Sequence, residues 1–276
     1  MTINRLKSLL TKGLVYAASS FTVAVLLVIV ADILRHGVPY LRPDLFAWKY
    51  DSVNVSLTPA LINTLSMTLL ALLAAVPAGL GAAVYLAEYA ARGGFFVKAV
   101  RVTAETLSGL PSIIYGLFGL LFFVTACRMG ISLLAGAMTL AMMILPLVMR
   151  TAEEALRAVP DSYREASFGL GAGRLRTVFR VVLPSAVPGI LAGVILGIGR
   201  IVGETAALIY TAGTVAEVAR SVFDSSRTLA VHMYTLSSEG LYMNQTYATA
   251  AMLLIITAGI NALSSFVARR FVHGSV

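Results

Sequence analysis

Six long apolar stretches, separated by shorter polar connections, dominate the pattern of this chain. They cover approximately residues 14–34, 60–85, 106–126, 132–149, 186–212 and 247–267. Each is close to the roughly 20 residues that a helix needs to cross a bilayer. The pattern predicts an all-α integral membrane protein with six transmembrane helices. The first stretch exceeds the ~7–15 apolar residues of a signal-peptide core and has no clear cleavage site after it, so we expect it to be an anchor.

The connection over 162–184 has a pattern of its own. Ser162 and Glu165 have the Ser-x-x-Glu spacing of a capping box, which predicts the start of a short helix. Three glycines at alternate positions, centred on Gly171, then favour a turn. A second short helix with one apolar face follows, and we expect Pro184 to close it. The connection therefore predicts a helix–turn–helix held between two membrane spans.

Composition supports a membrane protein and suggests its orientation. Hydrophobic residues make up 58% of the 276 residues and charged residues 12%, whereas charged residues make up about a quarter of soluble domains. With a cytoplasmic N-terminus, fourteen of the 21 Lys and Arg residues fall on the cytoplasmic side and six on the other, the last being Arg200 within a span. Positive charge favours the cytoplasmic side. We therefore expect a multi-pass protein of the cytoplasmic (inner) membrane with both termini and the 162–184 connection in the cytoplasm. This bias accounts for the net charge of +8 without a nucleic-acid partner.

The sequence lacks the residue patterns of disulfide frameworks, metal sites, ATP-binding subunits and intramembrane enzymes. Cys127 is the single cysteine, and the three histidines have no metal-ligand spacing, so we expect neither a disulfide framework nor a metal site. No Gly-x-x-x-x-Gly-Lys-Ser/Thr run occurs, so the chain does not read as an ATP-binding subunit. The rival class, an intramembrane enzyme, would need a nucleophile–base or metal constellation in the spans, and the sequence offers none.

The fifth apolar stretch contains two charges. From residue 186 to Arg200 a helix would rise about 21 Å, which places Arg200 past the middle of the membrane and Glu204 one turn further on the same face. Charges at such depth are functional candidates. The planar guanidinium suits phosphate oxygens, and Glu204 would neutralise it in the empty site. A structural ion pair that locks helices together is the alternative. Arg220, in the long 213–246 loop, is a third candidate for anion contact or else a solvated loop arginine.

A resemblance to a known family rests first on the 162–184 connection. Glu-Ala-Ser at 165–167, Gly at 171 and Val-x-Leu-Pro at 181–184 resemble the coupling loop of importer-type ABC permeases. The family pattern has Ala and Ile where this chain has Ser167 and Val181. The resemblance implies the ABC importer type I permease fold, with cytoplasmic coupling helices that insert into a groove on an ATPase subunit. The coupling residues it implies are Glu165, Ala166, Gly171, Leu183 and Pro184. The alternative is an ordinary amphipathic cytoplasmic loop.

Two further runs narrow the resemblance to phosphate-specific permeases. They are Ser-Gly-Leu-Pro-Ser-Ile-Ile-Tyr-Gly at 108–116 and Gly-Arg-Ile-Val-Gly-Glu-Thr at 199–205. The acidic pair Glu153-Glu154 before Ala-Leu resembles the PstA-like branch. The resemblance implies a subunit that forms half of a pathway for inorganic phosphate. Its partners would be a homologous permease, an ATP-binding subunit dimer and an external phosphate-binding protein. ATP would be used by the partner, so this chain would carry no cofactor. A PstC-like sibling and a permease for sulfate or molybdate remain alternatives.

The domain organisation follows from these expectations. We expect an N-terminal anchor helix and periplasmic loop over 1–59, a permease transmembrane domain over 60–270 with its coupling loop at 151–184, and a cytoplasmic tail over 271–276.

Overall fold

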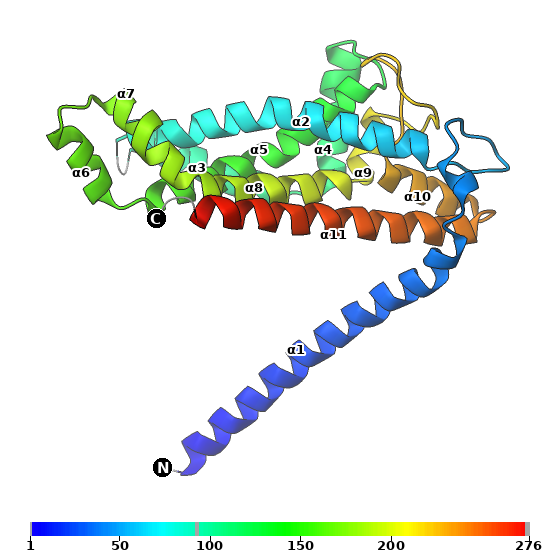
Figure 1. Cartoon of the computed structure of the whole chain (residues 1–276), viewed down its shortest axis with the longest axis horizontal. Helices are drawn as coiled ribbons and strands as arrows, with labels where there is room; N and C mark the ends of the chain where they lie inside the picture. The colour runs from blue at the N-terminus through cyan, green and yellow to red at the C-terminus, as the bar shows by residue number, and fades with distance from the viewer. Residues whose placement is uncertain (1, 92–93, 274–276) are drawn as a thin grey trace.

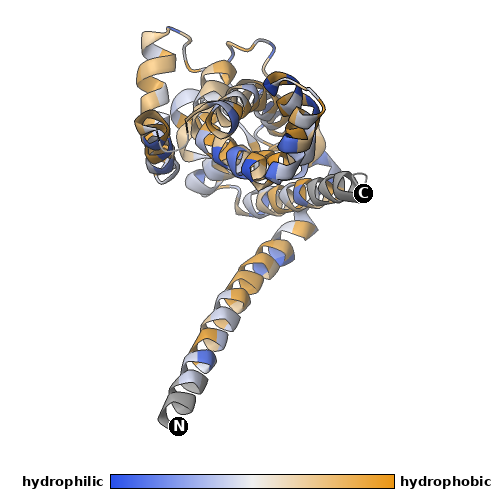
Figure 2. Ribbon diagram, turned by 90° about the vertical axis from the view of Figure 1, so that its left-hand side faces the viewer, coloured by the Kyte–Doolittle hydropathy of each residue, from blue (hydrophilic) through white to orange (hydrophobic). Residues whose placement is uncertain are grey.

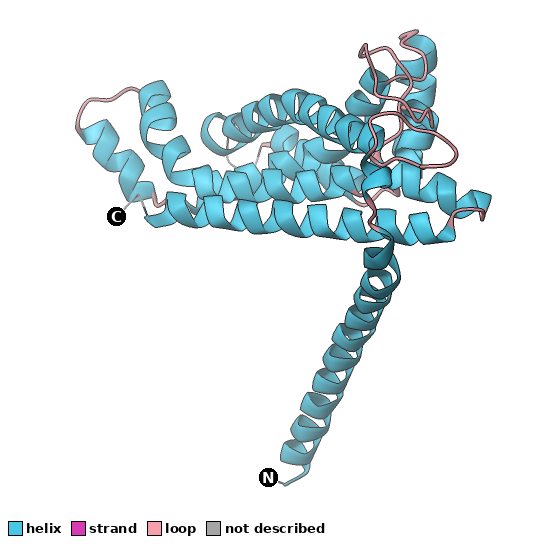
Figure 3. Ribbon diagram, turned by 45° about the vertical axis from the view of Figure 1, so that its right-hand side comes forward, coloured by secondary structure: helices cyan, strands magenta, loops and turns pink. Residues whose placement is uncertain are grey.

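The computed structural model describes residues 2–91 and 94–273, and within these ranges the regular structure is entirely helical (Figure 3). Arg92, which the charge count assigned to a cytoplasmic connection, lies outside the described residues, as do residues 274–276 of the expected tail.

The chain forms five long helices and six shorter ones within the described ranges. The long helices are α1 (Thr2–Gly37), α2 (Thr58–Val84), α5 (Leu133–Ala158), α8 (Leu183–Val202) and α11 (Met243–His273). The shorter helices are α3 (Phe95–Ser108), α4 (Ser112–Gly119), α6 (Asp161–Gly169), α7 (Arg174–Thr177), α9 (Ala206–Thr211) and α10 (Leu229–Glu239). The 3-10 turns η1 (Val38–Tyr40) and η2 (Pro43–Phe46) follow α1, and the π-helical turns η3 (Tyr85–Tyr89), η4 (Leu120–Ala126) and η5 (Val178–Val182) extend α2, α4 and α7.

Five of the six predicted membrane spans are single helices in the structure, and the remaining one is bent. Five helical stretches are long and apolar enough to cross a membrane. The remaining predicted span corresponds to α3 and the 112–126 segment, which meet at an angle of 102° and form either a broken span or a re-entrant loop. The prediction of a span that begins at residue 106 is therefore wrong. Gly109 and Pro111 separate the two helices, because proline cannot donate a backbone hydrogen bond and disfavours helix in the residue before it.

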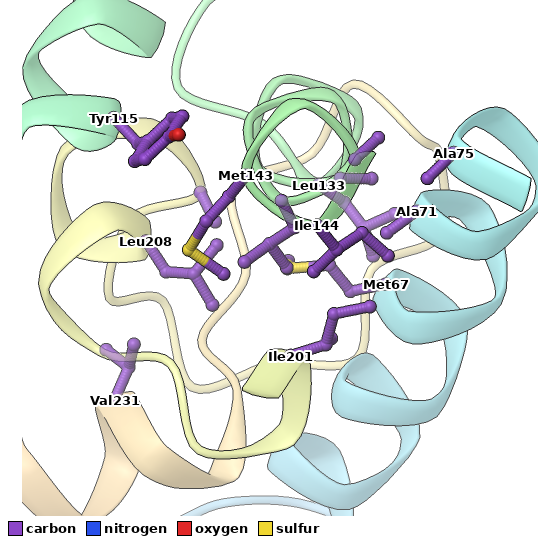
Figure 4. Packing of buried hydrophobic residues seen from close by; sticks show 14 of the residues in the cluster. Met67, Ala71, Ala75, Tyr115, Leu133, Met143, Ile144, Ile201, Leu208 and Val231 are labelled. Atoms are coloured by element: carbon purple, nitrogen blue, oxygen red, sulfur yellow. The ribbon is translucent and has the colours of Figure 1, made fainter. Parts of the chain in front are cut away.

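The centre of the bundle is the contact between α2 and α5. Met67 and Ala71 of α2 face Met143 and Ile144 of α5, and Leu208 of α9 closes the cluster (Figure 4). All five side chains are almost completely buried. Small residues on α2 let the two helices approach closely, as membrane helices commonly do.

The glycine stripe of the fifth span packs as the sequence predicts. Gly189 and Gly193 of α8 lie against Ala155 and Thr151 of α5, so closely that a methyl group at either position would overlap its neighbour. Gly197, one turn further, lies near Ile144. The stripe therefore fixes α8 onto α5, and the orientation of the charged end of α8 depends on this contact.

Helix α1 lies apart from the bundle. It contacts α11 near Gly37 and then runs away from the other helices (Figure 1). None of its most apolar window is buried within the chain, and Figure 2 shows hydrophobic residues along its length. Large side chains such as Leu14 and Phe21 are exposed in the isolated chain. Such a surface is compatible with lipid or a neighbouring subunit, not with water.

The two ends of the bundle differ. Helices α6 and α7 and the C-terminus lie at one end, while α10 and the long connections around it lie at the other (Figure 1). Helices α2, α5, α8 and α11 run between them. The two regions that the sequence singles out, the 162–184 connection and the 213–246 loop, are therefore on opposite ends of the molecule.

Candidate coupling and translocation sites

The arginine of the fifth predicted span lies at a break in the helix. Arg200 is half-buried in the last turn of α8, which ends at Val202, and α9 begins at Ala206. Gly203 and Thr205, both poor helix formers, occupy the break. In a membrane, broken helices of this kind occur where the freed backbone groups are buried in protein or line a cavity, and they often mark substrate sites.

Glu204 does not pair with Arg200. The prediction that it lies one turn further along the same helix face is wrong, because α8 stops two residues after Arg200. Its side chain is buried, and Oε1 accepts a hydrogen bond from the Ala207 backbone N–H at 3.2 Å. Among the described residues no ion pair joins it to Arg200. Glu204 instead satisfies a backbone donor at the start of α9, as a capping residue does.

The broken third span meets this break from the other side. Gly116 of α4 packs against α9, and a methyl group there would lie 2.8 Å from Cα of Ala207. One residue earlier, Tyr115 is buried, donates its hydroxyl proton to the Leu107 carbonyl at 2.7 Å, and lies within electrostatic range of Arg200. The 108–119 run is therefore a close-packing face. It also holds α4 against α9, the helix that follows the break.

Arg220 lies in the 213–246 loop, apart from these two breaks. Its side chain is exposed, and its backbone N–H donates to Asp224 Oδ2 at 2.9 Å. In the described part of the chain it forms no hydrogen bond or ion pair with Arg200 or Glu204. The structure thus brings Arg200 and Glu204 to one break and leaves Arg220 on the surface.

Hydrogen bonds from α2 hold the 213–246 loop in place. The Asn63 side chain donates to the backbone carbonyls of Glu217, at 2.8 Å, and Arg227, at 3.3 Å, and accepts from the Ala219 N–H at 3.0 Å. The neighbouring Thr64 hydroxyl accepts from the Leu229 N–H at 2.9 Å, where α10 begins. Sequence reasoning missed Asn63 because a single amide in an apolar helix carries no spacing signal.

A buried polar cluster beneath this loop was also missed. The Arg227 guanidinium lies 4.6 Å from the centroid of the Tyr50 ring and donates to the Thr235 hydroxyl at 3.2 Å. His232, on α10, is completely buried, and neither ring nitrogen makes a hydrogen bond of good geometry. Burial and the Arg227 charge lower the pKa of His232 to about 3, against a weaker opposing effect of the Val55 backbone. The imidazole is therefore neutral at physiological pH.

At the opposite end, α6, the glycine turn and α7 form a hairpin over residues 161–177, which we call the coupling hairpin. Gly171 has φ of +81°, a left-handed conformation that disfavours every residue with a side chain. Its N–H donates to the Phe168 carbonyl at 2.9 Å, which closes the turn. The sequence prediction of a glycine turn centred on this residue is confirmed.

The start of α6 differs from the prediction. The helix begins at Asp161, one residue early, and no side-chain capping bond is present at its N-terminus. The expected capping box of Ser162 and Glu165 is therefore wrong. Pro160 has extended backbone geometry just before the helix and can set the start without a cap, since proline restricts its own φ. The Glu165 and Ala166 side chains are exposed.

Pro184 does not end the second helix of the hairpin. Helix α7, the π-turn η5 and α8 form one continuous stretch over Arg174–Val202. The expectation that Pro184 closes a helix is therefore wrong. Proline is tolerated near the first turn of a helix, and the wider π-turn before it lets the chain pass Leu183 and Pro184 without a break. As a result the coupling hairpin is rigidly continuous with the span that carries Arg200.

The acidic pair before the coupling hairpin has two different environments. Glu153 is buried and pairs with Arg101 of α3 at 2.6 Å and with Arg157 at 3.1 Å. Glu154 is exposed, 4.0 Å from Arg150. Glu153 therefore ties α3 to α5, while Glu154 makes a surface pair of small energetic weight.

A large apolar groove lies between α2, α8 and α11, and it is distinct from the Arg200 region. Its volume is about 460 Å³, and residues such as Leu61, Leu65, Ile198, Val202 and Ile260 line it. Ile198 and Val202 are each two residues from Arg200. Because two residues turn a helix by about 200°, Arg200 points away from this groove. The polar residues that line the groove are Thr64 and Thr68, whose hydroxyls donate to backbone carbonyls of α2.

Comparison with known proteins agrees with this architecture. Residues 75–274 match the family described as "Binding-protein-dependent transport system inner membrane component". A Bacillus subtilis "Probable ABC transporter permease protein YqgI" is 33% identical over 84% of this chain and 84% of its own length. A Mycobacterium tuberculosis "Phosphate transport system permease protein PstA 1" is 37% identical over 76% of this chain and 71% of its own length.

Solved structures give the fold. A chain in an inward-facing structure of the MetNI methionine ABC transporter superposes with a TM-score of 0.64 at 20% identity, covering 81% of this chain and 99% of the other. A chain of a bacterial alginate ABC importer gives 0.65 at 17% identity, covering 96% and 98%. The chain therefore has the fold of an ABC importer permease, and it belongs to the family of inner membrane components of binding-protein-dependent transport systems.

Proposed function

We propose that this chain is a permease subunit of an ATP-driven importer of inorganic phosphate. The relatives named PstA support phosphate, with 36–37% identity over 73–76% of the chain in the mycobacterial proteins. The Gly-Arg-Ile-Val-Gly-Glu-Thr run at 199–205 supports it further, because it supplies a guanidinium at the helix break. A planar fork of donors can bind two phosphate oxygens at once.

The observation that carries the proposal is the exposed coupling hairpin at one end of the bundle. Its Glu165, Ala166 and Gly171 face outward, and large apolar side chains lie beside them without cover. These are Tyr163, Phe168, Leu170 and Leu175. An exposed apolar patch with polar neighbours is typical of a protein–protein contact. We expect it to dock into a groove on a cytoplasmic ATPase subunit, with Leu183 and Pro184 joining the hairpin to α8.

The transport mechanism follows from the continuity of that connection. Movement of the ATPase would displace the hairpin, and the unbroken Arg174–Val202 stretch would carry the displacement to Arg200. Together with a homologous permease, α8 and α4 would open the pathway alternately to either side. Arg200 would contact the anion, Glu204 would hold the start of α9, and Arg220 would meet phosphate at the external surface. This chain would form half of the pathway and perform no covalent step.

The assembly would contain four kinds of component. They are this chain, a homologous permease, two copies of an ATP-binding subunit and an external phosphate-binding protein. ATP would be hydrolysed by the partner subunits, so this chain needs no cofactor. Both termini and the coupling hairpin would face the cytoplasm, which agrees with the excess of Lys and Arg in those segments.

The nearest alternative is the sibling permease of the same transporter. A Mesorhizobium japonicum "Phosphate transport system permease protein PstC" is 30% identical over 81% of this chain, so the two branches are related. The higher identity to PstA proteins favours the first branch. A permease for sulfate or molybdate is the other alternative, because an arginine fork suits several oxyanions.

Transport of labelled anions tests the proposal. The chain is assembled with its partner subunits in vesicles that contain ATP, and uptake of phosphate, sulfate and molybdate is compared at equal concentrations. We expect phosphate to be taken up in preference, and only in the presence of ATP and the external binding protein. Preferential uptake of sulfate or molybdate would show that the chain belongs to an importer of that oxyanion instead.

A further inference from the structure

The cytoplasmic end of α2 contains a buried carboxylate that the proposed function does not use. Glu88 lies in the π-turn η3, and its side chain is 8% exposed. A buried charge without a partner is strongly unfavourable. The groups that surround Glu88 therefore indicate what it does.

Its partner comes from the coupling hairpin. Arg164 of α6 donates from Nη2 to Glu88 Oε1 at 2.6 Å and from Nε to the same oxygen at 3.2 Å. The same guanidinium donates to the carbonyls of Val159, at 2.7 Å, and Leu156, at 2.9 Å, at the end of α5. It also meets Asp161 Oδ1 at 3.2 Å. One side chain thus joins the hairpin to the ends of α2 and α5.

The other arm of the hairpin holds the same π-turn, η3. Arg174, at the start of α7, donates to the Glu88 backbone carbonyl. Its guanidinium also lies 5.0 Å from the centroid of the Tyr89 ring. Both arms of the coupling hairpin are therefore attached to residues 88–89, while Glu165 and Ala166 of the same hairpin stay exposed.

Helix α2 connects this attachment to the far end of the molecule. Asn63 and Thr64, near its start, bind the 213–246 loop and the first turn of α10. The helical stretch Thr58–Tyr89 is continuous, so Asn63 and Glu88 are separated by about 37 Å of helix. A stiff element that is bonded at both ends can transmit displacement between them.

We propose that the Glu88–Arg164 pair is a latch that passes movement of the coupling hairpin to α2, and through Asn63 to the 213–246 loop. This inference rests on the proposed docking of the hairpin on an ATPase. It assigns α2 a second transmission route, separate from the continuous α7–α8 connection. Arg164 and Glu88 are positioning residues in this scheme and touch no substrate.

A second buried ion pair offers a matched control. Glu153 has a side chain that is 6% exposed and pairs with Arg101 at 2.6 Å, so its burial and distance match those of Glu88 with Arg164. It lies on the same side of the bundle but joins α3 to α5 and makes no bond to the coupling hairpin. Loss of either pair should affect stability similarly, whereas only loss of the latch should affect coupling.

The first measurement is the ratio of phosphate transported to ATP hydrolysed in the complete transporter. The variants are Glu88→Gln, Arg164→Lys and the control Glu153→Gln. We expect the ratio to fall about fivefold or more in the first two, the scale of a typical coupling free energy, with ATP hydrolysis retained. The control should keep the normal ratio in whatever complex assembles. An unchanged ratio in Glu88→Gln, or an equal fall in Glu153→Gln, would overturn the latch. Failure of both latch variants to assemble, while the control assembles, would also overturn it, because the pair would then serve folding alone.

The second measurement is independent of the substrate. In a Cys127→Ser background, spin labels at Leu65→Cys on α2 and Leu241→Cys beyond α10 report the external end, and both positions are exposed. We expect ATP to change the distance between the labels in the background protein and in Glu153→Gln, but not in Glu88→Gln. Absence of any change in the background protein contradicts the latch. If the unaltered transporter moves no phosphate, the proposed substrate is wrong, while this distance still tests the latch.

Discussion

The Ser167 and Thr177 hydroxyl oxygens lie 2.8 Å apart, buried between the two arms of the coupling hairpin. Ser167 stands where the family pattern has alanine, and the hydroxyl it adds is the partner of Thr177. The serine that replaces the family alanine therefore has a hydrogen-bond partner inside the hairpin.

This pair predicts a non-additive effect of substitution. Ser167→Ala leaves the buried Thr177 hydroxyl without its partner, which should destabilise the hairpin by about 1–3 kcal/mol. The double variant Ser167→Ala/Thr177→Val removes both hydroxyls and should restore most of that loss. The rate of proteolysis within residues 161–177 of the purified protein measures the effect. Equal proteolysis in the single and double variants would contradict the pairing.

Gly171 should be the least replaceable residue of the hairpin. Its left-handed φ costs about 1–2 kcal/mol for a residue with a side chain, and Gly171→Pro also removes the N–H that donates to Phe168. We expect Gly171→Pro to insert normally but to uncouple ATP hydrolysis from transport. Gly173→Ala is the control, because Gly173 has φ of −73° and open space around it. Normal transport by Gly171→Pro would show that the hairpin does not couple the subunits.

Arg200 should act in the pathway. Arg200→Lys keeps the charge but loses the planar fork. Uptake per assembled complex should fall about tenfold or more, since one charge-assisted hydrogen bond contributes about 1.5–3 kcal/mol. The exposed external residue Arg42, changed to Lys, serves as the control. If Arg200→Lys and Arg200→Ala both transport normally per complex, Arg200 has no role in the pathway.

The role of Glu204 in assembly should depend on its side-chain oxygen as a hydrogen-bond acceptor more than on its negative charge. Glu204→Gln retains an oxygen for the Ala207 N–H and should assemble nearly normally. Glu204→Ala removes it, and loss of a capping acceptor costs about 1 kcal/mol, so less complex should assemble. The amount of assembled complex and the uptake per complex are measured together. A Glu204→Gln variant that assembles fully but loses uptake would restore the counter-ion role that the sequence suggested.

The buried, neutral His232 should make the folded protein less stable as the pH falls. Its pKa falls from 6.5 to about 3 in the folded chain, so the unfolded state binds a proton first as the pH drops. The neutral His232 contributes fully to the free energy of unfolding above about pH 6.5. This contribution declines toward pH 3, with a slope of up to ~1.4 kcal/mol per pH unit. Arg227 and Tyr50 are the charged and titratable groups that face it. Thermal unfolding of the purified protein and of His232→Leu is measured across this pH range. The difference between the two pH dependences of stability is the contribution of His232. Parallel pH curves for the two proteins would refute the effect.

The sequence by itself determined the fold class, the apolar stretches of bilayer length and the glycine turn of the coupling hairpin. Apolar stretches of bilayer length have few other structures available to them, because every backbone group in lipid must be bonded within the helix. The glycine turn was predictable for a similar reason, since a left-handed residue at position 171 excludes almost every other side chain. The stripe of Gly189 and Gly193 likewise specifies a close helix contact.

Only the tertiary structure decided where helices break and which charges meet. Periodicity extended the fifth span through Glu204, whereas α8 stops at Val202, and the Glu204 carboxylate instead accepts a hydrogen bond from the Ala207 N–H at the start of α9. Pairs such as Glu88 with Arg164, 76 residues apart in sequence, and Asn63 with the 213–246 loop depend on which helices lie side by side. Long-range contacts of that kind leave no periodic trace in the chain, so single buried charges and amides remain indistinguishable from surface residues until the bundle is assembled.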